Sequence, residues 1–132
     1  LLSLSLSAQN EEAPNAELSS QTEFIDALKE IHIGNTDKAI RLLETFKSKH
    51  PTNATAHYEL ARLYDHKGNA ENAILSIDQA VTLDPQNKWF RVQKINLLEK
   101  YNRLASVAVE YEMLATQDIE NYNYYENAAL AY

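Results

Sequence analysis

Residues 54–87 read ATAHYELARLYDHKGNAENAILSIDQAVTLDPQN, and two helical patterns lie on either side of a turn. In the first pattern, core-type residues recur at the spacing i, i+3, i+4 and i+7 that is typical of one helix face. These residues are His57, Leu60, Ala61 and Tyr64. The second pattern carries Ala73, Ile77 and Ala80. Gly68 can adopt the left-handed backbone that ends a helix, and Pro85 stops the second helix. The stretch therefore predicts two antiparallel helices.

The same surface recurs along the chain with a step of 34 residues. Equivalent positions form the sets Ala39, Ala73 and Val107; Leu43, Ile77 and Tyr111; and Phe46, Ala80 and Leu114. A fixed period of this length is typical of repeat proteins, in which each unit buries its apolar stripe against its neighbours. We therefore predict a repeat array rather than a single globular core. The small residues Ala61 and Ala73 are expected to let two helices approach closely.

The 34-residue unit resembles the tetratricopeptide repeat. That pattern has an aromatic residue, Leu, a small residue and Tyr on the first helix, and Ala, an aromatic residue, Ala and then Pro on the second. Residues 54–87 depart from it only where His57 and Ile77 replace the two aromatic residues. The resemblance implies an all-α fold. It would be an α-solenoid of antiparallel helix pairs that winds into a right-handed superhelix with a concave face.

The resemblance covers residues 20–132 and predicts about three repeats plus one extra helix. The predicted repeats are residues 20–53, 54–87 and 88–121, followed by a partial repeat at residues 122–132. In the third repeat, Arg91 and Lys94 depart from the apolar pattern. Asn102 replaces the turn glycine there, which the left-handed backbone region tolerates.

The first helix of the first repeat has two registers that both stay open. In the register of the other repeats, Glu23 and Asp26 occupy positions where apolar residues are expected. A rotation by about one residue instead gives an apolar stripe at helical spacing. That stripe consists of Phe24, Ala27, Leu28 and Ile31.

The two ends of the sequence differ from the repeats. Residues 1–8 are rich in Leu and Ser and resemble the end of a secretory signal peptide, although a short strand or tag is the alternative. Residues 9–19 show no periodicity and predict a flexible linker. At the other end, an apolar stripe is formed by Tyr125, Ala128, Ala129 and Tyr132. We expect the sequence to belong to a longer protein, and its open C-terminal end to fray or to self-associate.

Charge and composition exclude several classes of function. The net charge of −7 disfavours a nucleic-acid binder, which needs a basic stripe to neutralise phosphates. It also disfavours binding to an anionic membrane surface, and the apolar run at residues 1–8 is too short to span a bilayer. We therefore expect no nucleic acid as partner and no membrane insertion of the mature chain. The absence of cysteine excludes disulfides, a thiolate zinc site and a cysteine nucleophile.

No pattern in the sequence predicts catalysis, so we expect no enzyme, no cofactor and no metal. The four histidines, His32, His50, His57 and His66, do not form a His-Glu-x-x-His motif. A phosphate-binding loop is not expected, because the two glycines, Gly34 and Gly68, are both turn residues. His57 takes a core position, where a packed histidine is the expected role.

Two aromatic residues, Tyr58 and Trp89, are expected to project from first helices toward the predicted concave face. Polar and basic residues at helical spacing should share this face: Arg62, His66, Asn96 and Lys100. Aromatic anchors with a basic rim favour a peptide partner with apolar side chains and some acidic character. Some members of the family grip the terminal carboxylates of heat-shock chaperones with inner Lys, Asn and Arg side chains. This chain has Phe24, Leu28, Glu59, Trp89 and Gln93 at the matching positions, so the resemblance does not extend to that grip.

The leading hypothesis is a non-catalytic scaffold that binds a partner peptide or protein on its concave face. We expect it to be the N-terminal segment of a longer exported bacterial envelope protein, located in the periplasm. One alternative is an accessory domain of an enzyme or sensor whose catalytic part lies beyond residue 132. The other is a cytoplasmic adaptor, if residues 1–8 are not a targeting segment.

Overall fold

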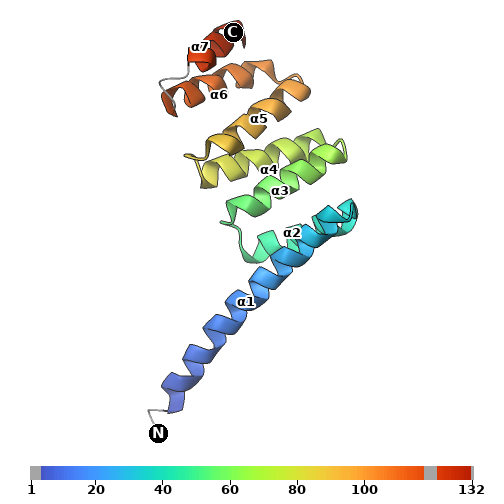
Figure 1. The fold of residues 1–132 in the computed structure, drawn as a ribbon, viewed down its shortest axis with the longest axis vertical. Helices are drawn as coiled ribbons and strands as arrows, with labels where there is room; N and C mark the ends of the chain where they lie inside the picture. The colour runs from blue at the N-terminus through green and yellow to red at the C-terminus, as the bar shows by residue number, and fades with distance from the viewer. Residues whose placement is uncertain (1–3, 118–121, 132) are drawn as a thin grey trace. The chain divides into compact units, whose positions relative to one another are not determined.

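The structure is a computed structural model that describes residues 4–117 and 122–131, with the side chains of residues 15–117 and 126–131. These residues are helical apart from short turns, and they contain no strand (Figure 1). The helices are α1 (Leu4–His32), α2 (Thr36–Lys49), α3 (Ala54–His66), α4 (Ala70–Leu83), α5 (Lys88–Lys100), α6 (Leu104–Gln117) and α7 (Tyr122–Ala131). The starts of α3, α5 and α7 lie 34 residues apart, as do those of α2, α4 and α6. The predicted all-α fold of paired helices is therefore confirmed.

The turn inside each helix pair is the same at every repeat. Gly34, Gly68 and Asn102 have φ angles of 80°, 73° and 58°. This is the left-handed backbone region, which glycine adopts without strain and asparagine tolerates. Asn102 therefore preserves the turn in the repeat that lacks a glycine, as the sequence predicts.

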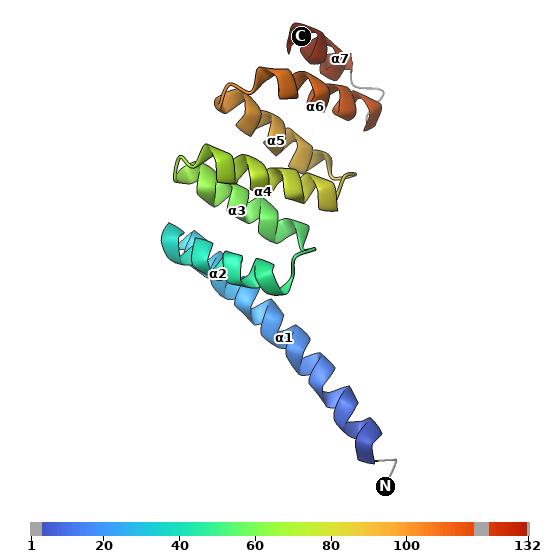
Figure 2. The same cartoon turned by 180° about the vertical axis from the view of Figure 1, so that it is seen from behind.

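By contact, the chain divides into two compact units, an N-terminal unit (Leu1–His50) and a C-terminal unit (Pro51–Tyr132). The N-terminal unit consists of α1 and α2, which pack as an antiparallel pair (Figure 2). Ala27 is buried, and the ring of Phe24 packs on Phe46 with centroids 5.1 Å apart. Asp26 is exposed, and its carboxylate pairs with Lys29. The structure thus follows the rotated register at Phe24 and Ala27, but Leu28 of the same expected stripe is 37% exposed.

Helix α1 begins earlier than the sequence indicates. We expected a flexible linker at residues 9–19, but these residues belong to the 29-residue helix α1. The segment contains the strong helix formers Ala, Glu, Gln and Leu, and also Pro14, which lacks the amide hydrogen for one backbone hydrogen bond. A helix already nucleated by packing on α2 can extend through such residues without a second nucleation cost. Whether residues 1–8 are a targeting segment stays a prediction.

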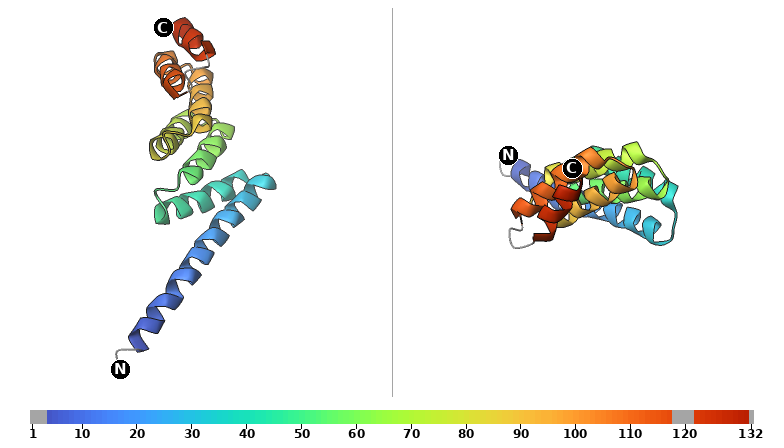
Figure 3. Two further views of the ribbon diagram at one scale, coloured as in Figure 1. Left: turned by 60° about the vertical axis from the view of Figure 1, so that its left-hand side comes forward. Right: turned by 90° about the horizontal axis from the view of Figure 1, so that it is seen from above.

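The C-terminal unit stacks α3 to α7 so that each helix packs on the next. Figure 3 shows α3 and α5 in one layer and α4 and α6 in the other. Between the layers, buried residues from α3, α4 and α5 form one core: Ala61, Ala73, Ile77, Ala80, Val81, Phe90 and Leu97. A second core joins α5 to α6 and consists of Ile95, Leu98, Val107 and Leu114. These buried positions follow the predicted 34-residue step.

His57 and α7 complete the core of the C-terminal unit. His57 is buried, and its Nε2 lies 2.9 Å from the backbone oxygen of Pro51, so it is a packed core histidine as predicted.

In α7, Ala128 is buried and Ala131 packs on the second core, whereas Ala129 is exposed. The expected stripe is therefore wrong at Ala129. The side chains of Tyr125 and Tyr132 lie outside the described residues.

Candidate functional site

An aromatic pair joins the first helices of two successive repeats. The indole Nε1 of Trp89 on α5 donates a hydrogen bond of 3.1 Å to the Tyr58 hydroxyl oxygen on α3. The Tyr58 ring stacks on Phe90, with centroids 5.2 Å apart, and Phe90 belongs to the buried core. Trp89 is 56% exposed although it is a large aromatic residue. The aromatic pair is therefore anchored to the core through Tyr58 and open to solvent at Trp89.

Arg62 lies one turn further along α3 and is already paired. Its guanidinium forms an ion pair of 3.0 Å with Glu59, and its central carbon lies 5.8 Å from the centre of the Tyr58 ring. The Arg62 side chain is exposed, whereas the Glu59 side chain is only 13% exposed. Arg62 therefore neutralises a carboxylate that is mostly removed from water.

Lys100 is paired in the same manner at the other end of the two helices. Its ammonium contacts Asp65 Oδ1 at 2.8 Å, and the Tyr101 hydroxyl donates to the same oxygen at 2.7 Å. Partial burial acts to raise the pKa of Asp65, but the hydrogen bonds from Lys100 and Tyr101 outweigh it and lower that pKa. The hydrogen bond to Asp65 also raises the pKa of Lys100. The pair therefore stays charged at neutral pH.

The two helices thus form one surface, which we call the α3–α5 face. Direct contacts connect four of the predicted site residues on it, Tyr58, Arg62, Trp89 and Lys100, with the acidic partners Glu59 and Asp65, and helical spacing alone assigns His66 and Asn96 to the same surface. Helical spacing aligns the residues on each helix, and the contacts Tyr58–Trp89 and Asp65–Lys100 connect the two helices near both ends. His66 and Asn96 are both exposed.

The charge of this face differs from the expected basic rim, because Glu59 and Asp65 pair with the two predicted cations. The predicted set of site residues did not contain these two carboxylates. A signal for Glu59 was present, since Glu and Arg three residues apart on a helix are neighbours. Asp65 and Lys100 are 35 residues apart, and only the packing of α3 beside α5 brings them together.

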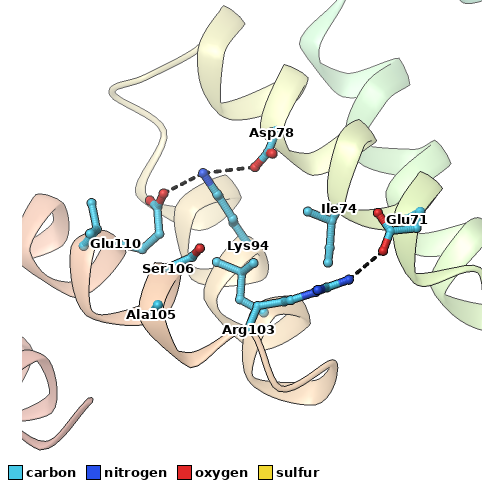
Figure 4. A pocket seen from close by; sticks show the side chains of 10 residues that line it. Glu71, Ile74, Asp78, Lys94, Arg103, Ala105, Ser106 and Glu110 are labelled. Carbon is cyan, nitrogen blue, oxygen red and sulfur yellow. Dashed lines mark hydrogen bonds and ion pairs between the residues drawn. The ribbon is translucent and has the colours of Figure 1, made fainter. Parts of the chain in front are cut away.

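A second feature that the sequence did not predict is a buried ion-pair network in the third repeat. Arg91 and Glu110 are both buried, and Arg91 Nη1 donates to Glu110 Oε2 at 2.6 Å. Lys94 Nζ lies 2.5 Å from Glu110 Oε1 and 3.0 Å from Asp78 Oδ1 (Figure 4). Burial acts to lower the pKa of Lys94, but hydrogen bonds to Glu110 and Asp78 outweigh it and raise that pKa. The two cations that interrupt the apolar pattern are therefore compensated by two carboxylates.

Beside this network, residues of α4, α5 and α6 and the turn before α6 line a cleft of about 520 Å³. Ile74, Leu98 and Val109 contribute apolar surface to it. The charged groups in its wall pair with one another, as Figure 4 shows for Lys94 with its two carboxylates and for Arg103 with Glu71. The cleft therefore offers apolar surface but no uncompensated charge to a ligand.

The described part of the chain shows neither a membrane-spanning helix nor a cluster of metal-binding side chains. There, no helix combines the length and the apolar character that crossing a membrane requires. The same residues contain no group of three His, Cys, Asp or Glu side chains that could hold a metal ion.

Comparison with known proteins places this geometry in a known fold. A family model described as "Tetratricopeptide repeat" matches residues 54–87. No curated protein sequence matches the chain. Among solved structures, MamA residues 41 to the end, from Desulfovibrio magneticus RS-1, superimposes with a TM-score of 0.70 at 16% identity. The match covers 86% of this chain and 64% of the MamA chain, so this chain spans less than two thirds of that relative.

Two similar structures contain a bound peptide. One is the type III secretion chaperone SycD of Yersinia enterocolitica with a peptide of the translocator YopD, at a TM-score of 0.68 and 13% identity, covering 84% of this chain and 85% of that chain. The other is the first repeat domain of Spaghetti (RPAP3) with the HSP90 peptide SRMEEVD, at a TM-score of 0.68 and 15% identity, covering 85% and 89%. Identities this low establish the fold alone. Residues 54–87 are a tetratricopeptide repeat, and the chain has the helical-repeat fold of tetratricopeptide-repeat proteins.

Proposed function

We propose that this chain is a non-catalytic scaffold that binds a peptide or protein segment on its α3–α5 face. The observation that carries the proposal is Trp89, a large aromatic side chain that is 56% exposed yet held in place by its hydrogen bond to Tyr58. An exposed aromatic residue of this kind is typical of binding hot spots, because it offers a large contact area that loses little freedom on binding. The peptides bound to SycD and RPAP3 support the general role, since those proteins share the fold.

The α3–α5 face is favoured over the α4–α6 cleft for a physical reason. In the cleft, charged groups of the wall are paired with each other, and a ligand would have to compete with these pairs. The α3–α5 face also contains ion pairs, but a partner can contact the solvent-exposed indole ring of Trp89 without separating any of them. Binding there therefore requires less rearrangement.

Affinity capture with matched variants tests this proposal. Trp89→Ala removes the exposed ring, and Leu75→Ala is the control, because Leu75 is a similarly exposed apolar residue (60%) on the outer helix α4. Partners captured by the wild type from cells that produce the protein should be lost with Trp89→Ala and retained with Leu75→Ala. Circular dichroism should show that both variants keep their helicity. Capture that survives Trp89→Ala, or that is lost only with Leu75→Ala, contradicts the assignment.

We also propose that the protein is exported, with residues 1–8 as the end of a signal peptide. The apolar Leu and Ser run that closes on the small residue Ala8 supports this proposal. N-terminal sequencing of the native protein provides the test. A mature chain that begins near Gln9 is the expected result, and an intact Leu/Ser segment on a cytoplasmic species would contradict export.

A further inference from the structure

We infer that the partner of the α3–α5 face is a segment without net charge, which places an aromatic or large aliphatic side chain against Trp89. The inference rests on the proposed function and adds the chemistry of the partner. It replaces the acidic partner that the isolated basic residues of the sequence favour, because the structure pairs those residues internally.

Charge on the face is balanced by two ion pairs. Arg62 pairs with Glu59, and Lys100 pairs with Asp65, so the formal charges of these four groups cancel. An acidic partner would meet two cations whose charges are already neutralised by contacting carboxylates, so its net electrostatic attraction would be small. The face therefore does not select a partner by charge sign.

The burial of Glu59 makes competition for Arg62 unfavourable. The Glu59 side chain is 13% exposed, and Arg62 is the cation in contact with it. A partner carboxylate that drew Arg62 away would leave Glu59 mostly buried without its counter-ion, which is costly. Asp65 is in a similar position, since it is 26% exposed and holds both Lys100 and the Tyr101 hydroxyl. An acidic partner would thus replace existing ion pairs with new ones, and the gain in binding free energy would be small.

The aromatic groups of the face, in contrast, are already held in a fixed orientation. Tyr58 is fixed by stacking on Phe90, and it accepts the indole hydrogen bond that orients Trp89. The indole ring is therefore positioned before a partner arrives, which reduces the entropy lost on binding. Because the Tyr58 oxygen acts as the acceptor, its own hydroxyl hydrogen can be donated to a backbone carbonyl of the partner. A segment with one large apolar side chain and accessible backbone carbonyls fits both groups.

Selection from a displayed library of random peptides of about twelve residues tests the inference, since segments of this length span two neighbouring helices. The library is selected on the wild-type chain, and each enriched peptide is then tested on Trp89→Ala and Leu75→Ala. Trp89 is the one tryptophan of the chain, so its fluorescence reports binding to the wild type and to Leu75→Ala, and calorimetry measures the affinity of the same peptides for every variant. Trp89→Phe is a second variant that keeps a ring while removing the hydrogen bond to Tyr58.

The inference predicts that Trp89-dependent peptides carry an aromatic or large aliphatic residue and have a net charge near zero. Their affinity should fall about tenfold or more with Trp89→Ala and change less than about threefold between low and high salt. Trp89→Phe should bind more weakly than the wild type but more tightly than Trp89→Ala. Leu75→Ala should bind like the wild type.

Two other results would each have a distinct meaning. Peptides that depend on Trp89 but are strongly acidic or basic, and that lose about tenfold or more in affinity at high salt, would overturn the inferred partner chemistry and leave the proposed function intact. A selection that yields no peptide dependent on Trp89 would overturn the proposed function itself.

Discussion

At the residue scale, Ala61 and Ala73 determine how closely α3 and α4 approach each other. Both are buried in the same core, together with Ile77. Replacing Ala73 with Leu should force the helices apart and lower the free energy of unfolding by about 1–3 kcal/mol. Glu71→Gln is the control, because the Glu71 side chain is 75% exposed and its pair with Arg103 lies at the surface. Thermal unfolding followed by circular dichroism would show equal effects of the two substitutions only if the helix register were wrong.

Glu110 is the second residue whose role can be tested individually. It faces both Arg91 and Lys94, so Glu110→Ala would leave the buried Arg91 without a counter-ion, whereas Lys94 would keep its ion pair with Asp78. The expected loss is about 3–5 kcal/mol in the free energy of unfolding, measured by urea denaturation. Glu112→Ala, at an exposed position of the same helix, should change stability by less than about 0.5 kcal/mol. A similar loss in both variants would show that the network does not stabilise the fold.

The same network predicts how stability depends on pH. Lys94 has a raised pKa in the folded chain, so it holds its proton more tightly there than in the unfolded chain, where the pKa is 10.5. Its contribution to stability is therefore complete below pH 10.5 and is lost as the pH rises through the folded-state pKa. Urea midpoints measured from neutral to alkaline pH should fall more steeply for the wild type than for Lys94→Met. Parallel curves would contradict this assignment.

At the element scale, the 34-residue period predicted the helix pairs well. The turns at Gly34, Gly68 and Asn102 and the buried positions of α2, α4 and α6 all follow local spacing, which is visible in sequence. The N-terminal extent of α1 could not be predicted from local spacing, because this part of the helix has no apolar periodicity that would indicate a helix. Propagation from the packed part of the helix accounts for the difference.

The candidate site was predictable only in part, also for reasons at the element scale. Helical spacing places Tyr58 and Trp89 on neighbouring first helices, and the structure joins them by a hydrogen bond. The pairing of Lys100 with Asp65 and of Arg91 with Glu110 depends on which helices become neighbours and on side-chain direction. A one-dimensional pattern therefore identified these cations but not the charges that neutralise them.

At the scale of the whole molecule, stability should decrease toward α7. This helix packs on α6, and among its described side chains Ala128 is buried whereas Leu130 is 79% exposed. In repeat proteins each unit is stabilised by its neighbours, so a helix with few buried contacts opens more readily. Hydrogen exchange should therefore be faster for the amides of α7 than for those of α3 and α4. Equal protection in α7 and α3 would contradict this expectation.

Self-association is a related whole-molecule proposal. Leu104 on α6 and Leu130 on α7 are both exposed, and a second copy that covered them would remove apolar surface from water. Light scattering over a range of concentrations tests it. A mass that stays that of one chain would exclude this surface as a dimer contact.

The central claim is that a partner segment binds the α3–α5 face, and backbone amide chemical shifts test it most directly. An isotope-labelled chain is titrated with a peptide obtained by selection on the wild-type protein. We expect the largest shifts in α3 and α5, together with the indole N–H of Trp89 and the amide of Tyr58. Largest shifts around the α4–α6 cleft or in α7, with an unchanged indole resonance, would contradict it.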